Sequence, residues 1–274
     1  MPEAPEVEAI AITLRALVRG RRISRVRVRH AIGVKPQTAG LLNRSVSSAR
    51  ISDVERRGKY LLLALDRGCV SMHFKFDGQL VWFDGPADAL KRNVHWDVGF
   101  EFEDGMLGFV DPRHLGRVHW LARPEDSSGI KALGVDAFSP QFTFSEFNEI
   151  CRVRPRPLKM LLTDQTRIAG VGNIYSAEAL WHARLSPFRR SDRLTAAEAR
   201  KLHKAVVSVL ARALECCLNP PPDFRNSQWW FTGLEEILRV YDREGVPCRR
   251  CGSKIRRVEQ SGRSTYFCAH CQRP

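Results

Sequence analysis

The sequence lacks a long hydrophobic run, a secretion signal and any repeated or low-complexity segment. No apolar stretch approaches the roughly 20 residues that a membrane-spanning helix needs. The N-terminus begins with acidic residues and shows neither the basic segment nor the apolar core of a signal peptide. We therefore expect a globular, cytoplasmic protein with no membrane partner.

Acidic residues are few relative to basic ones. The chain has 30 Asp and Glu against 44 Lys and Arg, which gives a formal net charge of +14. An imbalance of this size indicates a polyanionic partner, for which nucleic acid is the first candidate. An anionic membrane surface is the second, but no basic amphipathic segment with an aromatic face supports it. With 274 residues, of which 43% are hydrophobic, the chain is long enough for two domains, or for two domains and a small appendage.

The eight cysteines fall into two groups. Four of them form two Cys-x-x-Cys pairs separated by sixteen residues, namely Cys248, Cys251, Cys268 and Cys271. In a reducing compartment, pairs at this spacing hold a metal more often than they form disulfides. Four thiolates complete a tetrahedral shell and leave no open position, so we predict one structural Zn²⁺. The other four cysteines have no ligand partner at suitable spacing, and we interpret them as buried apolar residues.

The hydrophobic pattern changes from mainly period two to helical near residue 125. A helix over 6–19 precedes alternating segments that predict an antiparallel β domain, with strands at 25–29, 60–65, 70–76, 96–102 and 106–110. The second part predicts helices over 157–163 and 174–183. A further helix begins at Thr195, where Glu198 completes a capping box, and ends before the prolines at 220–222.

The first residues of the chain offer covalent chemistry. Without Met1, Pro2 would carry a free secondary amine whose pKa is near 8, about two units below that of lysine. Such an amine can attack a carbonyl-like carbon at neutral pH, and Glu3 lies beside it to transfer protons. The alternative interpretation is an ordinary disordered start.

Three further segments could contact nucleic acid. Asn173 follows a Gly-Val-Gly turn at the start of a predicted helix, where backbone N–H groups can hold a phosphate. Arg113 and Leu115 would lie on one side of a tight loop, and Phe76 ends its predicted strand at a turn. Apolar groups at such positions either belong to the core or, if exposed, suit insertion into a base stack. The aromatic run at 229–231 is open to the same two interpretations.

These segments occur together in one known family. The matching residues are Pro2-Glu3-x-Pro5-Glu6-Val7, Arg57-Gly58-Lys59-Tyr60-Leu61, Asp111-Pro112-Arg113, Gly170 to Tyr175 with Glu178, Val240-Tyr241 with Arg243-Glu244-Gly245, and the four cysteines with Arg263. From residue 2 to its end the chain resembles the formamidopyrimidine-DNA glycosylase and endonuclease VIII family. The resemblance implies an α+β multidomain fold. Its parts are an N-terminal β-sandwich with a flanking helix (1–125), a helix-two-turn-helix domain (126–240) and a four-cysteine zinc finger hairpin (241–274).

The resemblance also implies an activity, namely base-excision repair by a DNA glycosylase that is also an abasic-site lyase. Pro2 would attack C1′ of the damaged nucleotide and Glu3 would assist the proton transfers, while elimination cuts the strand. The implied catalytic residues are Pro2, Glu3, Lys59 and Arg263, and the implied DNA-binding residues are Glu6, Phe76, Arg113, Leu115, Lys159 and Asn173. The partner would be double-stranded DNA with a damaged base or an abasic site, bound by a monomer in a bacterial nucleoid.

Departures from the family pattern leave the lesion open. Phe76 stands where bacterial formamidopyrimidine enzymes usually have methionine, and Leu115 where they have phenylalanine. The stretch from Pro220 to Gly233 also differs from the loop that covers an extruded oxidised purine in those enzymes. Oxidised purines, oxidised pyrimidines and bulkier lesions all remain candidates. A DNA-binding protein that keeps the fold without chemistry is the alternative function, although it would not need the Pro2-Glu3 pair. An RNA-binding zinc protein lacks a recognisable basic-aromatic sheet motif.

Overall fold

A computed structural model describes residues 2–153 and 155–273, which divide into two compact units. Among these residues, the first unit contains 2–131 and 217–231, and the second contains 132–153, 155–216 and 232–273. The helical part and the cysteine-rich hairpin thus share one unit. Residues 217–231 group with the N-terminal part, whereas the boundaries expected from the sequence place them in the helical domain. The division into three domains stays a prediction.

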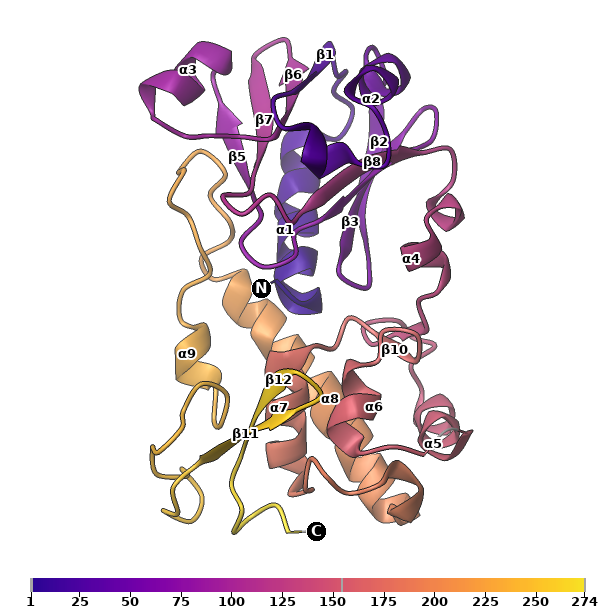
Figure 1. The fold of residues 1–274 in the computed structure, drawn as a ribbon, viewed down its shortest axis with the longest axis vertical. Coiled ribbons are helices and arrows are strands. Elements are labelled where there is room, and N and C mark those ends of the chain that lie inside the picture. The colour runs from indigo at the N-terminus through magenta and orange to yellow at the C-terminus, as the bar shows by residue number, and fades with distance from the viewer. Residues whose placement is uncertain (1, 154, 274) are drawn as a thin grey trace. The chain divides into compact units, whose positions relative to one another are not determined.

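The first unit is built on two four-stranded antiparallel sheets (Figure 1). One sheet has the order β1-β6-β7-β5 and the other has the order β2-β3-β4-β8. The strands are β1 (Arg25–Val28), β2 (Ile51–Arg57), β3 (Tyr60–Leu65), β4 (Cys69–His73), β5 (Gln79–Phe83), β6 (Val98–Phe102), β7 (Gly105–Val110) and β8 (Arg117–Leu121). The helices are α1 (Ala4–Val18), η1 (Ala31–Val34), α2 (Ala39–Val46), α3 (Pro86–Lys91), η2 (Pro124–Asp126) and α4 (Ser128–Lys131). The predicted sandwich with its flanking helix is confirmed.

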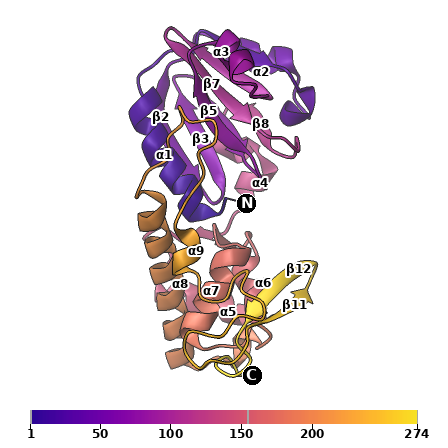
Figure 2. The same ribbon diagram turned by 90° about the vertical axis from the view of Figure 1, so that its left-hand side faces the viewer.

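Helix α1 runs antiparallel to strand β2 and packs on the sheet that contains it (Figure 2). Near the start of the helix, Glu8 pairs with Arg56 at 2.6 Å between Oε2 and Nε. Near its end, Arg15 pairs with Asp53 at 2.7 Å. These two ion pairs fix the alignment, so the first turn of α1 lies beside the turn that joins β2 to β3.

Strand β4 ends earlier than the alternating pattern suggests. The sequence predicts a strand that continues to Phe76, but the structure ends it at His73, and this prediction is wrong. Lys75 adopts a left-handed conformation with φ of +56°, which a strand residue cannot have. The alternation of Phe74 and Phe76 therefore does not mark one sheet face, because Phe74 is buried and Phe76 is 48% exposed.

The segment 217–231 covers the free edge of β5 in the first sheet (Figure 1). The backbone N–H of Trp82 donates to the Phe224 carbonyl at 2.7 Å, and Trp229 Nε1 donates to the Leu80 carbonyl at 2.7 Å. Pairing of this kind protects an edge strand from other chains. Two residues of the aromatic run, Trp229 and Phe231, are core, whereas Trp230 is 45% exposed.

The second unit is mostly helical. It contains β9 (Val135–Asp136), α5 (Phe144–Val153), α6 (Leu158–Thr163), β10 (Ile168–Ala169), α7 (Asn173–Ala183), η3 (Ser191–Arg193), α8 (Ala196–Cys217), α9 (Leu234–Ile237), β11 (Arg256–Gln260) and β12 (Arg263–Phe267). The predicted capping box is present, since Thr195 N–H donates to Glu198 Oε2 at 2.9 Å and Glu198 N–H donates to Thr195 Oγ1 at 3.2 Å. No helix in the described part of the chain is long and apolar enough to cross a membrane.

A buried carboxylate connects α7 to the segment that leads into the cysteine-rich hairpin. Glu178 accepts backbone hydrogen bonds from Arg239 at 2.8 Å, Val240 at 2.9 Å and Tyr241 at 2.8 Å. Burial raises the pKa of Glu178, although these three donors act in the opposite direction. Because the segment 239–241 is irregular, Glu178 supplies the acceptors that a sheet or helix would otherwise provide.

Substitution of Glu178 by Ala should lower the free energy of unfolding by about 3 kcal/mol, because it leaves three N–H groups without an acceptor. Urea denaturation measures this change, and Glu215→Ala, an exposed position of α8, serves as the control. Equal stability of the two variants would contradict the anchoring role of Glu178.

Candidate active site and metal centre

The predicted nucleophile and acid lie at the first turn of α1. Pro2, Glu3 and Glu6 are all buried. The Glu3 N–H donates to Glu6 Oε2 at 2.8 Å, so Glu6 fixes the backbone from which the Glu3 side chain extends. This is a positioning role, and it agrees with the support expected of Glu6. Met1, on whose removal a free Pro2 amine depends, lies outside the described residues.

Lys59 lies in the two-residue turn between β2 and β3. Arg57 and Tyr60 form the last register pair of these strands, which leaves Gly58 and Lys59 as the turn residues. Gly58 has φ of +59°, a value that favours glycine. Since α1 and β2 are antiparallel, this turn lies at the level of Glu3. The structure thus brings Lys59 to the end of the first unit that carries Pro2 and Glu3.

His73 is a neighbour of this turn that the sequence analysis did not single out. It stands opposite Tyr60 in the β3–β4 register, and its ring lies edge-on to the Tyr60 ring at 4.7 Å between centroids. Burial, with the positive charges of Lys75 and Lys59, lowers the pKa of His73 to about 3. The imidazole is therefore neutral at physiological pH within a positive field, a setting that suits an anion.

The three predicted probes gather on one loop and the adjacent turn of the first unit. Phe76 is 48% exposed and Leu115 is 40% exposed, so neither belongs to the core. The Arg113 guanidinium lies 4.9 Å from the centre of the Phe76 ring and forms an ion pair with Asp77. Below them Gly116 faces Phe109, where an added Cβ would come within 2.6 Å of the ring. The side chains of Phe76, Leu115 and Arg113 therefore reach solvent, while the backbone beneath them is tightly packed.

The second unit brings Asn173, Lys159 and the hairpin that carries Arg263 together. Asn173 Nδ2 donates to the Ser264 carbonyl at 3.0 Å, which ties the first residue of α7 to strand β12. Lys159 is 3% exposed, and its Nζ donates to the Asn173 carbonyl at 3.4 Å. Arg263 is exposed and follows a tight turn in which Ser261 and Gly262 both have positive φ.

A cavity of about 320 Å³ lies between α6 and this hairpin. Its lining includes Arg156, Lys159 and Arg263, together with one carboxylate, that of Asp164. Arg156 is bound to Asp164 at 2.8 Å, and three cationic side chains line the cavity against one acidic side chain. A cavity of this charge can hold a phosphate group.

The four predicted cysteines form the metal centre. The Sγ atoms of Cys248, Cys251, Cys268 and Cys271 all lie within 4.8 Å of one another. Hydrogen bonds from Ser253 lower the pKa of the Cys251 thiol to about 6, which favours the thiolate that binds metal. Four sulfur ligands on two Cys-x-x-Cys pairs fit a tetrahedral Zn²⁺, whose role here is structural because no ligand position stays open.

Trp181 of α7 supports this centre, although no sequence motif identifies it. Its indole Nε1 donates to Cys248 Sγ at 3.4 Å, and the Arg250 guanidinium lies 3.9 Å from the centre of its ring. Trp181, Val240 and Tyr266 belong to one buried cluster with two of the cysteines. The metal centre is thus packed directly onto α7, the helix that begins with Asn173 (Figure 1).

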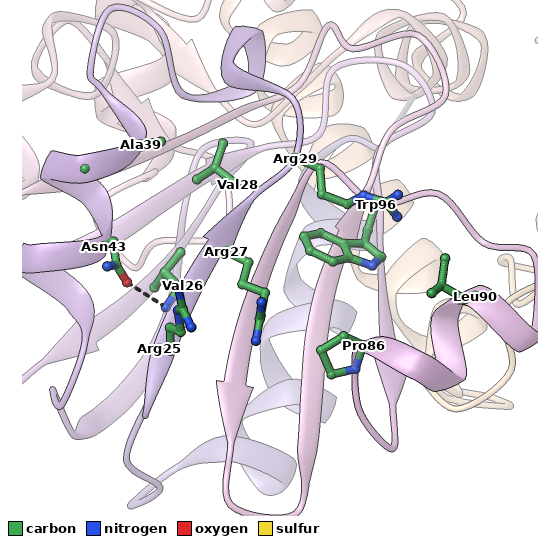
Figure 3. Close-up of a pocket in the computed structure, with 11 residues that line it drawn as sticks. Arg25, Val26, Arg27, Val28, Arg29, Ala39, Asn43, Pro86, Leu90 and Trp96 are labelled. Carbon is green, nitrogen blue, oxygen red and sulfur yellow. Dashed lines mark hydrogen bonds between the residues drawn. The ribbon is translucent and has the colours of Figure 1, made fainter.

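A separate pocket in the first unit contains none of the predicted site residues (Figure 3). Its volume is about 570 Å³, and its lining includes Arg25 and Arg27 of strand β1 and Arg29, which follows the strand. The Arg29 guanidinium lies 5.1 Å from the centre of the Trp96 ring, and Arg27 forms an ion pair with Glu101. These contacts already engage two of the three arginines within the protein, so we do not assign the pocket to the active site.

Family models match three consecutive parts of the chain. Residues 1–118 match the formamidopyrimidine-DNA glycosylase N-terminal domain, and residues 133–218 match the formamidopyrimidine-DNA glycosylase H2TH domain. Residues 245–274 match a zinc finger found in FPG and IleRS.

Similar proteins cover the whole chain. The formamidopyrimidine-DNA glycosylase of Pelotomaculum thermopropionicum is 38% identical over 279 residues, covering 100% of this chain and 99% of that protein. The MutM (Fpg) crystal structure from Thermus thermophilus has a TM-score of 0.83 and 35% identity, and the match covers 99% of this chain and 98% of that one. Lactococcus lactis Fpg bound to an oxidised pyrimidine containing DNA has a TM-score of 0.88 and 27% identity, with 100% of both chains covered.

Replacement of Trp181 by Phe should weaken zinc binding about tenfold, because it removes the donor to Cys248 Sγ while it keeps an aromatic ring in the cluster. Competition with a chromophoric chelator measures the affinity. Trp230→Phe, at an exposed position, is the matched control and should bind zinc as the wild type does. Unchanged affinity in Trp181→Phe would show that the indole N–H does not support the metal centre.

The low pKa of His73 predicts an acid-sensitive fold. The folded protein keeps His73 neutral, whereas the unfolded chain protonates it near pH 6.5. The contribution of the neutral His73 to the free energy of unfolding is therefore complete above pH 6.5 and is lost as the pH falls towards 3. At pH 5 the loss is about 2 kcal/mol. Urea unfolding at pH 7.5 and pH 5 should show a smaller acid loss for His73→Gln than for wild type. The exposed His95→Gln control should follow the wild type, and a His73→Gln profile equal to wild type would refute the assignment.

Proposed function

Because this chain belongs to the formamidopyrimidine-DNA glycosylase family and is a DNA glycosylase and abasic-site lyase of base-excision repair, we propose that Pro2 is its nucleophile and Glu3 its proton-transfer group. The observation that carries this proposal is the joint position of Pro2 and Glu3 at the start of α1, with Glu6 holding the Glu3 backbone. In the full sequence the Pro2 nitrogen is an amide, so the nucleophile exists only once Met1 has been removed.

The reaction follows from the two groups. The free Pro2 nitrogen attacks C1′ of the damaged nucleotide, and the bond from C1′ to the base breaks. The base leaves with the electron pair and takes up the proton that the Pro2 nitrogen releases. Glu3 gives its proton to the ring oxygen as the sugar opens, which leaves an iminium between Pro2 and C1′. The iminium acidifies the C2′ proton. The Glu3 carboxylate takes this proton, and the electron pair expels the 3′ phosphate oxygen, which cuts the strand.

Positive and polar side chains of each unit would contact phosphates of the bound DNA. In the first unit these are Lys59 and, next to it, the neutral His73, whose surroundings favour an anion. In the second unit they are Asn173 and Arg263, with Lys159 beneath them. Base extrusion costs a few kcal/mol, and such contacts offset it. Lys159 acts from a buried position, through the backbone of Asn173 and the adjoining cavity.

Phe76, Arg113 and Leu115 would fill the space that the extruded base leaves. Two observations support this role. The side chains are exposed on one loop and an adjacent turn, and the Arg113 guanidinium lies against the Phe76 ring. Apolar side chains that insert between bases stabilise an unstacked duplex. Structures of Lactococcus lactis Fpg contain Fapy-dG DNA and oxidised pyrimidine DNA. We extend this class of substrate, an oxidised or ring-opened base in double-stranded DNA, to the present chain.

The partner of the chain is DNA, and its relatives are bacterial proteins. We propose that it acts as a monomer on the bacterial nucleoid. Its net charge of +14 supports this location, since a basic protein associates with DNA even where no lesion is present.

Borohydride trapping on a duplex with an abasic site tests the nucleophile. The wild type should form a covalent adduct, because borohydride reduces the iminium to a stable amine. Pro2→Gly should lose most of the adduct, whereas Pro124→Gly, in a turn of the same unit, should retain it. A protein that binds the duplex but yields no adduct would be a non-catalytic DNA-binding member of the fold. An adduct formed equally by Pro2→Gly would place the nucleophile elsewhere.

A further inference from the structure

Two histidines and one aspartate cluster in the first unit, outside the groups described above. The ligand atoms of His30, Asp97 and His114 all lie within 4.8 Å of one another. Asp97 is buried, His114 is half-buried and His30 is exposed. The cluster therefore extends from a buried carboxylate to an imidazole that solvent can reach.

The backbone of the first sheet holds two of these residues in place. The N–H groups of Arg29 and His30 donate to the Asp97 carbonyl at 2.8 and 3.4 Å, and the Asp97 N–H donates to the Phe109 carbonyl at 2.8 Å. His30 and Asp97 thus stand at adjoining ends of the paired strands β1 and β6. Their separation is set by the sheet and does not depend on a flexible loop.

His114 completes the cluster from the loop after β7. Its Nδ1 lies 2.8 Å from Asp97 Oδ1 and 3.0 Å from Oδ2. Its ring centre is 4.4 Å from that of His30, with the planes tilted by 33°. His114 has φ of +53°, which is uncommon for a residue other than glycine. An unusual backbone conformation therefore brings the second imidazole to the buried carboxylate.

Two imidazoles and a carboxylate are a ligand set for Zn²⁺ and related transition cations. Bonds of about 2.1 Å place neighbouring ligand atoms roughly 3 to 3.5 Å apart, and Asp97 Oδ2 and His114 Nδ1 are already 3.0 Å apart. We propose that His30, Asp97 and His114 form a second, exchangeable site for a divalent transition cation, in addition to the structural zinc. Water would complete its coordination.

The proposed site adjoins the loop that carries the DNA probes. His114 stands between Arg113 and Leu115 in the chain, and the Arg117 guanidinium donates to the carbonyls of Leu115 and Gly116 at 2.9 and 2.6 Å. Arg117 is thus turned towards backbone oxygens of the loop. A cation bound to His114 would fix this loop to the sheet through Asp97. The assignment of the site itself does not depend on the proposed function.

Calorimetric titration of Zn²⁺ into the full chain, with the cysteine site already loaded, tests the proposal. The wild type should take up one further equivalent. His30→Asn and His114→Asn should each bind it at least tenfold more weakly, and Asn suits position 114 because it tolerates positive φ. His95→Asn is the matched control, since His95 is exposed and two residues from Asp97 but outside the cluster.

Metal analysis after dialysis gives the stoichiometry independently, and circular dichroism confirms that each variant is folded. No uptake beyond the cysteine site by the wild type would overturn the proposal. Wild-type affinity in either His30→Asn or His114→Asn would overturn it as well. Equal weakening in His95→Asn would show that the uptake is general binding to surface histidines.

Discussion

The buried carboxylate of Glu178 is the interaction on which the second unit depends. Three backbone N–H groups converge on it, and they belong to the residues that connect the helices to the cysteine-rich hairpin. Placing a charge in the interior is unfavourable unless donors surround it. The hydrogen bonds therefore hold residues 239–241 against α7, before the chain continues into the hairpin of β11 and β12. The hydrogen bond from Asn173 Nδ2 to the Ser264 carbonyl then ties the residue next to Arg263 to the start of α7.

Local patterns in the sequence predict the parts of the fold that depend on neighbouring residues. The capping box of Thr195 and Glu198, the helix that starts near Glu6 and the strand at 60–65 all rest on spacing within a few residues. The metal centre is equally predictable, because the spacing within each Cys-x-x-Cys pair places two sulfur atoms where they can bind one ion. The probes Phe76 and Leu115 were identified by type, and only the structure shows that they are exposed.

Features that arise from distant contacts were not predictable in this way. The strand predicted to reach Phe76 ends at His73, because Lys75 turns the chain into a left-handed conformation that no pattern of apolar residues encodes. Residues 217–231 leave the helical unit and cover an edge strand 149 positions earlier in sequence, from Trp229 to Leu80. Trp181 supports a thiolate 67 positions away. In each case the partner is chosen by tertiary packing, which a single sequence does not reveal.

The contact between Trp181 and Cys248 has a consequence for a protein that repairs oxidised DNA. Thiolates that ligate zinc are also the groups that peroxides convert to sulfenic acids and disulfides, with release of the metal. Loss of the ion would loosen the packing of the hairpin on α7. The amide of Asn173 and the guanidinium of Arg263 would then no longer be held in place. The same oxidants that create substrate lesions would then diminish the capacity to hold them, unless cellular reductants keep the four sulfurs reduced.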